Sequence, residues 1–350
     1  MAKSKGGIIK KILILLVLGA LAFGAFWAYE NIFKSNVHLN GKKFTYIYIK
    51  TGATFNDLLD ELYSQNIIDD HESFEWMAKS MHLPEHINSG KYRIDSKMSN
   101  RSIAKMIISG KQEKVKLSFN SQIRTKEQFI EYVSDKLEIE SGELEDYCSN
   151  EDILGEEYGL NSENFMCLIV PETYEVNWTT HIEDLFPLIE KSYSAVWTKA
   201  KKDKAKSIGY SVPEVVTIAS IVQSESAIKT EQQKIAGVYI NRLKQDMKLQ
   251  ADPTVVFANG NFDVQRVLSI DKEIDSPYNT YRYRGLPPGP ICLVKPSVID
   301  AVLNYTKHNY TYFCAKADFS GYSNFTNDYK VHMKNASAYQ EALNKKGIKR

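Results

Sequence analysis

The residues with the clearest chemical potential lie at the end of one predicted helix. Residues 213–226 read PEVVTIASIVQSES, and a proline at position 213 suits the first turn of a helix. Glu225 follows Ile218 by seven residues and Ile221 by four, so its carboxyl group projects from the apolar face of that helix. Burial raises the pKa of a carboxyl group, which is what a general acid near neutral pH requires. The alternatives are a glutamate turned to solvent or one in a structural ion pair.

Polar residues in the next two segments offer partners for this carboxyl group. Residues 231–246 show a helical apolar stripe, and Asn241 and Arg242 lie where they could hydrogen-bond a sugar or orient a carboxylate. The alternative for both is a place on a capped surface helix. Gln250 and Asp252 follow in the string QADPT, which is typical of a turn. Asp252 is therefore a second carboxylate, an orienting group or a cap.

An aromatic, proline-rich stretch follows at residues 276–290, SPYNTYRYRGLPPGP. Proline and glycine predict a stiff, extended loop. Tyr278, Asn279 and Tyr281 suit a saccharide groove, because aromatic faces stack on sugar rings and amides bind hydroxyl groups. Aromatic residues interleaved with arginine also suit single-stranded nucleic acid. The balanced charge of the chain, with 44 Lys and Arg against 43 Asp and Glu, argues against nucleic acid.

Composition and cysteine spacing exclude several classes of protein and of site. A chain of 350 residues that is 43% hydrophobic and 25% charged is ordinary globular protein, long enough for two soluble domains. Its four cysteines, at 148, 167, 292 and 314, contain no CxxC pair, and one disulfide, 148–167 or 292–314, stays open. Residues 82–86 match the H-x-x-E-H string of a zinc-protease class, but Pro84 obstructs the continuous helix that such a site needs. We therefore predict no metal site and no cofactor.

The N-terminus predicts a membrane anchor. Residues 1–11 carry four lysines and no acidic residue, and residues 12–29 form an uncharged apolar run of 18. At about 1.5 Å per residue such a helix spans about 27 Å, which matches a bilayer core. The lysines should stay in the cytoplasm, and Trp27 and Tyr29 sit where an interfacial aromatic belt would lie. The alternative is a cleaved signal peptide with Ala20-Leu21-Ala22 as its cleavage site. Both place residues 30–350 outside the cytoplasm.

The remaining chain predicts an α+β protein in two parts. Residues 30–42 are expected to be a polar tether, and residues 43–112 a small α+β domain with strands near 44–49 and 90–94. Residues 113–350 form the larger α+β domain, in which Thr125 and Gln128 predict a capping box. Helices are expected around 183–208, 213–230 and 231–246, followed by a loop-rich stretch at 252–332.

Six ordered blocks resemble the endolytic murein transglycosylase (YceG-like) family. The resemblance covers roughly residues 43–340 and is strongest from 170 to 291. The blocks are VPETY at 170–174, ASIVxxE at 219–225, IAGVYINRL at 235–243, LQADPTV at 249–255, SPYNTY at 276–281 and GLPPGPI at 285–291. Members often carry glutamate at both the 223 and 225 positions, and here the first is Gln223. The family's His before the Phe of a later block corresponds to Ser323, and a Pro-Gly corresponds to Pro296-Ser297, which weakens any role assigned near 296–332, including His332.

The resemblance implies an anchored enzyme with a LysM-like domain at 43–112 and a catalytic domain at 113–350, on the extracytoplasmic side of a bacterial cytoplasmic membrane. It implies a lyase that cuts nascent peptidoglycan strands after N-acetylmuramic acid and leaves 1,6-anhydro ends. This cleavage would terminate strand elongation. Glu225 would be the acid and then the base. Asn241, Arg242, Gln250, Asp252, Tyr278, Asn279 and Tyr281 are the candidates for substrate positioning. Its partners would be glycan strands and peptidoglycan synthases, the penicillin-binding proteins.

Two other functions remain open from the sequence. A hydrolase would use Glu225 and Asp252 as a pair of carboxylates, as ordinary glycosidases do. A non-catalytic peptidoglycan-binding scaffold would use neither.

Overall fold

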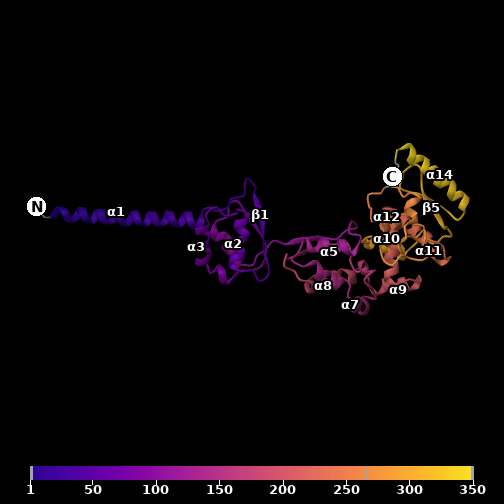
Figure 1. The fold of residues 1–350 in the computed structure, drawn as a ribbon, viewed down its shortest axis with the longest axis horizontal. Helices are drawn as coiled ribbons and strands as arrows, with labels where there is room; N and C mark the ends of the chain where they lie inside the picture. The colour runs from indigo at the N-terminus through magenta and orange to yellow at the C-terminus, as the bar shows by residue number, and fades with distance from the viewer. Residues whose placement is uncertain (1–2, 265, 348–350) are drawn as a thin grey trace. The chain divides into compact units, whose positions relative to one another are not determined.

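The computed structural model describes residues 3–264 and 266–347, and it is a mixture of helices and short strands. The chain divides into two compact units (Figure 1). The first unit contains residues 1–115, 136–138 and 175–180, and the second contains residues 116–135, 139–174 and 181–350. The predicted fold class, an α+β protein with one apolar N-terminal helix, is therefore confirmed.

The first unit is built on an antiparallel pair of strands separated in sequence by two helices. Its elements are β1 (Phe44–Ile49), α2 (Phe55–Ser64), α3 (His71–Ser80), η2 (Leu83–Glu85), β2 (Gly90–Asp95) and α4 (Asn100–Ile108). In the register of the two strands, Ile47 lies opposite Tyr92 and Ile49 opposite Gly90. Thr54 begins α2 with a capping box, in which its hydroxyl accepts from the N–H of Asp57 and the carboxylate of Asp57 accepts from the N–H of Thr54.

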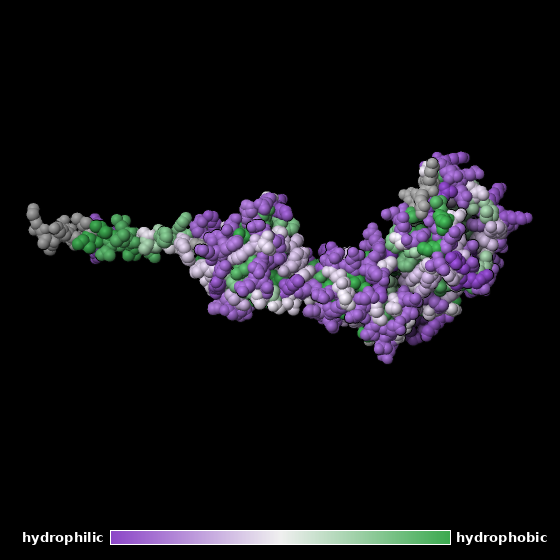
Figure 2. All heavy atoms as spheres, viewed as in Figure 1, coloured by the Kyte–Doolittle hydropathy of each residue, from purple (hydrophilic) through white to green (hydrophobic). Residues whose placement is uncertain are grey.

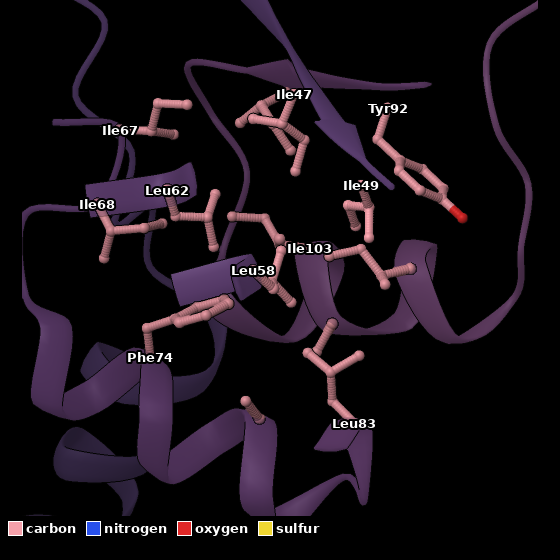
Figure 3. Packing of buried hydrophobic residues seen from close by; sticks show 14 of the residues in the cluster. Ile47, Ile49, Leu58, Leu62, Ile67, Ile68, Phe74, Leu83, Tyr92 and Ile103 are labelled. Carbon is pink, nitrogen blue, oxygen red and sulfur yellow. The ribbon is translucent and has the colours of Figure 1, made fainter. Parts of the chain in front are cut away.

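The core of this unit follows from the period-two pattern of its strands and the apolar faces of its helices. Ile47 and Ile49 of β1 point inward while Tyr48 between them is exposed. Figure 3 shows these isoleucines among side chains contributed by both helices and by the second strand. The fully buried members include Leu58, Leu62, Phe74, Leu83, Tyr92 and Ile103.

The N-terminal helix α1 (Lys3–Ala28) has an apolar stretch long enough to cross a membrane, from Ile9 to Ala28, with mean hydropathy 2.2. Its apolar residues make a continuous hydrophobic surface in Figure 2. A π-helical segment, η1 (Tyr29–Phe33), follows directly. Within the predicted tether, Ser35 and Val37 bridge to Ser99 and Ile68 of the first unit, so this part of residues 30–42 is folded.

The second unit begins with short elements and continues into a helical core. The first group, in which β3 and β4 include residues of both units, is β3 (Val115–Ser118), α5 (Lys126–Ser134), α6 (Ser141–Cys148), α7 (Glu151–Ile153), η3 (Leu154–Tyr158), η4 (Phe165–Cys167), β4 (Thr173–Val176), α8 (Ile182–Val196) and α9 (Lys199–Ser207). The second group is α10 (Val212–Glu225), α11 (Lys229–Lys244), α12 (Asp252–Asn259), η5 (Ile270–Glu273), α13 (Pro296–Leu303), β5 (Tyr312–Ala315), β6 (Ser323–Thr326) and α14 (Tyr329–Lys345). Helices α10, α11 and α13 pack against one another.

Several local predictions were wrong in their details. The helix expected over 183–208 is two helices, because Thr198 caps a new one at Lys199. Thr125 caps α5, but the side chain of Gln128 accepts from the N–H of Arg124, so the reciprocal capping box is absent. The stretch at 252–332 is loop-rich as predicted, and α12, α13, β5 and β6 lie within it. Neither open disulfide forms, since all four cysteines are free thiols.

Candidate active site

Helix α10 carries Glu225 as its last residue. Ser211 caps the helix start in a capping box with Glu214, and every residue from Val215 to Val222 is buried. Neighbouring helices, among them α11 and α13, cover this central stretch on more than one side, which is why even its polar residues Thr217 and Ser220 are buried. The helix stops at Glu225 because Ser226 adopts an extended conformation, five residues before the predicted end at 230. The carboxyl group therefore sits at the edge of the core, where a substrate can reach it.

A tyrosine from the neighbouring helix holds this carboxyl group. Tyr239 of α11 is buried, with 2% of its surface exposed, and its hydroxyl donates to Oε1 of Glu225 at 2.7 Å. Burial raises the pKa of Glu225 to about 7; the Tyr239 hydrogen bond lowers it, and the negative charge of Asp252 raises it further. The carboxyl group is thus part protonated at neutral pH, as a general acid requires.

Asp252 lies in a different setting, with its side chain exposed at the start of α12. The Tyr281 hydroxyl donates to Oδ1 of Asp252 at 2.6 Å, and Lys272 Nζ lies 3.4 Å from the same oxygen. Lys272 also donates to the Tyr281 hydroxyl at 3.0 Å and sits over its ring, 4.1 Å from the centroid. Burial and the charges of Asp252 and Glu225 raise the pKa of Tyr281 far above its ordinary value, so it remains a donor.

Arg242 of α11 is buried and bonded to backbone carbonyl groups. It donates to the carbonyl oxygens of Leu249 at 2.8 Å and Thr311 at 2.6 Å, and also to Gln250 Oε1 at 3.3 Å. Gln250 has a φ of 53°, a left-handed conformation that is costly for a residue with a side chain. The guanidinium group thus stabilises the turn that leads into α12 and Asp252.

The two asparagines of the predicted set also bond to backbone groups. Asn241 donates to the carbonyl oxygens of His308 at 2.7 Å and Tyr310 at 2.9 Å. Asn279 is fully buried, donates to Lys272 and Ile274 carbonyls, and accepts from the Tyr281 N–H at 3.0 Å. Asn241 therefore fixes the segment after α13, while Asn279 fixes the loop that presents Tyr281 and Lys272.

Tyr278, from the same loop, packs its ring against Phe257 of α12, with centroids 4.5 Å apart. Burial raises the pKa of Tyr278 to about 12. The loop and α12 are therefore joined by this ring contact, by the Tyr281–Asp252 hydrogen bond and by a hydrogen bond between the hydroxyls of Thr280 and Thr254 at 2.8 Å. Among the predicted residues, Glu225, Asp252 and Tyr281 act on one another electrostatically, and Gln250 and Arg242 support them.

The side chain of Gln223 joins α10 to the segment before α13. Its amide donates to the Leu293 carbonyl at 2.8 Å and accepts from the Lys295 N–H at 2.9 Å, so both ends of the group are used. Ser220 adds a third link by accepting from the Ile291 N–H at 3.0 Å. A carboxylate at position 223 could accept but not donate in this arrangement. Gln223 thus has a structural task on a different side of α10 from Glu225, because two residues turn an α-helix by about 200°.

Sequence reasoning did not select Tyr239 or Lys272. Tyr239 belongs to the inner apolar stripe of α11, where a tyrosine looks like core, and its hydroxyl partner lies on another helix. Lys272 lies outside the quoted motifs, in η5. The H-x-x-E-H string lies on a 3-10 turn, and its His82 has a φ of 58°, so both histidines cannot share one α-helical face. In the described residues, no cluster of three or more His, Cys, Asp or Glu could hold a metal ion.

Comparisons with known proteins agree with one another. A model of the YceG-like family matches residues 47–338. An endolytic murein transglycosylase of Bacillus subtilis (strain 168) is 40% identical over 179 residues, which cover 51% of this chain and 49% of the relative. An endolytic murein transglycosylase of Streptococcus pneumoniae serotype 2 is 27% identical over 363 residues, covering 93% of this chain and 64% of the relative. The chain thus spans about half to under two thirds of the length of these relatives.

A solved structure has a similar fold. The crystal structure of a putative yceG-like protein from Listeria monocytogenes matches with a TM-score of 0.57 and 25% sequence identity, over 84% of this chain and 99% of that chain.

Proposed function

The chain belongs to the YceG-like family, and from this membership and the setting of Glu225 we propose that it is a membrane-anchored endolytic lytic transglycosylase. It would cut nascent peptidoglycan strands after N-acetylmuramic acid, leave 1,6-anhydro ends and so terminate strand elongation. The names of the relatives support the reaction class.

The observation that carries the proposal is the hydrogen bond between the buried Tyr239 and Glu225, the last residue of α10. Glu225, with its pKa near 7, donates its proton to the glycosidic oxygen as the bond from that oxygen to C1 of N-acetylmuramic acid breaks. The resulting carboxylate accepts the Tyr239 hydrogen bond at Oε1, which stabilises the charge. The carboxylate then removes the proton of the sugar's own 6-hydroxyl as O6 bonds to C1. Glu225 ends protonated, and no water is consumed.

The seven other candidates divide into two roles in this proposal. Asp252, Tyr281, Tyr278 and Gln250 belong to the turn and the loop whose Asp252 and Tyr281 interact electrostatically with Glu225, and we assign these four residues contact with the sugar chain. Asn241, Arg242 and Asn279 act indirectly, because their hydrogen bonds hold the backbone that presents the first group.

Helix α1 supports the proposed location. Its apolar stretch is proposed to anchor the chain in the cytoplasmic membrane, with the N-terminal lysines inside and residues 30–350 outside. The first unit is proposed to be a LysM-like glycan-binding module, which its two antiparallel strands enclosing two helices support. Peptidoglycan synthases that produce the strands are the proposed partners.

A hydrolase that uses Asp252 as its second carboxylate is the main alternative, because the charge of Asp252 acts on Glu225. Its carboxylate is already engaged by Tyr281 and Lys272, which favours a positioning role over a nucleophilic one.

The mass of the products tests the proposal. Purified glycan strands are digested with the full chain in detergent and the new ends are weighed. Anhydro ends are the expected result. Reducing ends, heavier by one water, would establish the hydrolase, and intact strands would establish a binding scaffold.

A further inference from the structure

The apolar helix and the first unit are joined by folded chain. Helix α1 passes straight into η1, and the Lys34 N–H donates to the Tyr29 carbonyl at 3.0 Å. Two residues later, Asn36 is buried; its amide donates to the Asp70 carbonyl at 2.7 Å and to Asn100 Oδ1 at 2.9 Å. It also accepts from the Asp70 N–H at 2.8 Å. A buried polar group with its partners satisfied fixes this junction.

Large aromatic side chains gather at the same junction. Trp27, at the end of α1, packs edge-on against Trp76 of α3, with ring centroids 4.9 Å apart. Tyr29 and Phe33 of η1 are each 58% exposed, and Trp76 is 42% exposed. Segment η1 contacts both α3 and α4. We call Trp27, Tyr29, Phe33 and Trp76 the aromatic collar.

The position of the aromatic collar along the chain indicates that lipid covers it. Trp27 and Tyr29 stand at the end of the 20-residue apolar stretch, which is the depth at which Trp and Tyr collect in membranes. Trp76 comes from a different element, 49 positions later, yet its ring contacts Trp27 and must lie at the same depth. Arg101 of α4 lies over the Phe33 ring at 5.7 Å, which places a cation beside the collar.

We propose that the aromatic collar is a membrane-docking surface, by which the first unit sits in the lipid headgroup region instead of moving freely above it. The inference rests on the proposed anchoring of α1. Burial of exposed aromatic surface in the interface stabilises the docked state, and Arg101 lies where lipid phosphate groups would be. The docked surface then fixes the height of the first unit above the membrane.

Fluorine NMR on the full chain tests this docking. The chain contains four tryptophans, Trp27, Trp76, Trp178 and Trp197, which can all be replaced by 5-fluorotryptophan. The protein is placed in nanodiscs of phosphatidylcholine and phosphatidylglycerol, and each resonance is assigned by a single Trp→Phe variant. A lipid spin-labelled near the headgroup reports contact with lipid, and a soluble gadolinium chelate reports contact with water. Trp178, which packs against Tyr48 in the first unit, is the matched control.

The expected result is strong broadening of Trp27 and Trp76 by the labelled lipid, several-fold above that of Trp178, and weak broadening by gadolinium. If Trp27 is broadened by lipid but Trp76 is reached by gadolinium, α1 is an anchor and the docking proposal is wrong. If Trp76 is shielded from both probes, a protein surface covers it and the proposal is equally wrong. If neither Trp27 nor Trp76 responds to the lipid label, the anchoring itself fails, and the docking with it.

Discussion

The end of α10 and the start of α12 each present one carboxyl group, in opposite electrostatic settings. Glu225 terminates a buried helix and accepts a hydrogen bond from the Tyr239 hydroxyl. Asp252 begins an α-helix at the surface and has a tyrosine and a lysine beside it. A negative charge is favoured at a helix N-terminus and disfavoured at a C-terminus. The helix ends thus add to the effect of burial, which already separates the two groups.

In the proposed reaction, this difference gives two similar side chains different tasks. The transferable proton is assigned to the group for which ionisation is costly, and the positioning to the group whose charge is compensated. A two-carboxylate hydrolase with Asp252 as its second group would need that charge free to attack or to activate water. The contacts of Asp252 with Tyr281 and Lys272 argue that it orients the loop or the sugar.

The largest expected effect comes from Glu225→Gln, which keeps the shape and removes the transferable proton. Strand cleavage should fall by about 10²–10⁴-fold, the usual range for losing a general acid–base. Release of soluble glycan fragments measures it. Glu214→Gln, on the same helix, is the matched control, because Glu214 is a cap whose role glutamine can fill. Retention of more than a few per cent of activity in Glu225→Gln would remove Glu225 from the role of acid.

Asp252→Asn tests the second carboxyl group of the comparison. We expect a loss of about tenfold, within the lower part of what a positioning contact contributes, with products that remain anhydro-ended. The charge of Asp252 raises the pKa of Glu225, so its removal should shift the alkaline limb of the pH–rate profile downward. Rate profiles and product masses from the same digests give both readouts. Asp252→Asn as inactive as Glu225→Gln, together with reducing ends, would establish the hydrolase.

The sequence predicted the face of α10 that carries Glu225, because helical periodicity depends only on residues close in the chain. It did not predict where the helix ends, since Ser226 is not a strong helix breaker. The string with Asp252 and Pro253 was interpreted as a turn, yet proline also suits the first turn of a helix, and α12 begins there.

The sequence did not predict hydrogen-bond partners that lie far apart in the chain. Asn241, Arg242 and Asn279 are residue types that often bind sugars, but here their amide and guanidinium groups bond to backbone carbonyls. Tyr239 looked like core because only its tertiary neighbour, Glu225, makes its hydroxyl important. The strands and core of the first unit were more predictable, since alternating burial appears directly in residues 44–49.

Tyr239→Phe should move the pH–rate profile in the direction opposite to Asp252→Asn. The Tyr239 hydrogen bond lowers the pKa of Glu225, so its loss should raise that pKa and shift the alkaline limb of the profile upward. The rate at neutral pH should fall by less than tenfold, because the carboxylate formed on proton transfer loses its donor. Tyr193→Phe is the matched control, since Tyr193 is a buried tyrosine of α8 to which no role in the site is assigned. Shifts in the same direction for both Tyr239→Phe and Asp252→Asn would contradict this arrangement.

The smallest expected effect concerns stability. Because the folded state raises the pKa of Glu225 from 4.5 to about 7, it binds more protons than the unfolded chain between these values. The free energy of unfolding should therefore fall as pH rises through that window. Glu225→Gln removes this penalty, so the variant should be more stable than the parent above about pH 7, by about 1 kcal/mol once the partial solvent access of the carboxyl group is considered, and equal to it below about pH 4. Thermal unfolding of both proteins at the two ends of the window measures the difference. A stability difference that does not change with pH would mean that Glu225 titrates alike in the folded and unfolded chains, and the acid role would then lose its electrostatic basis.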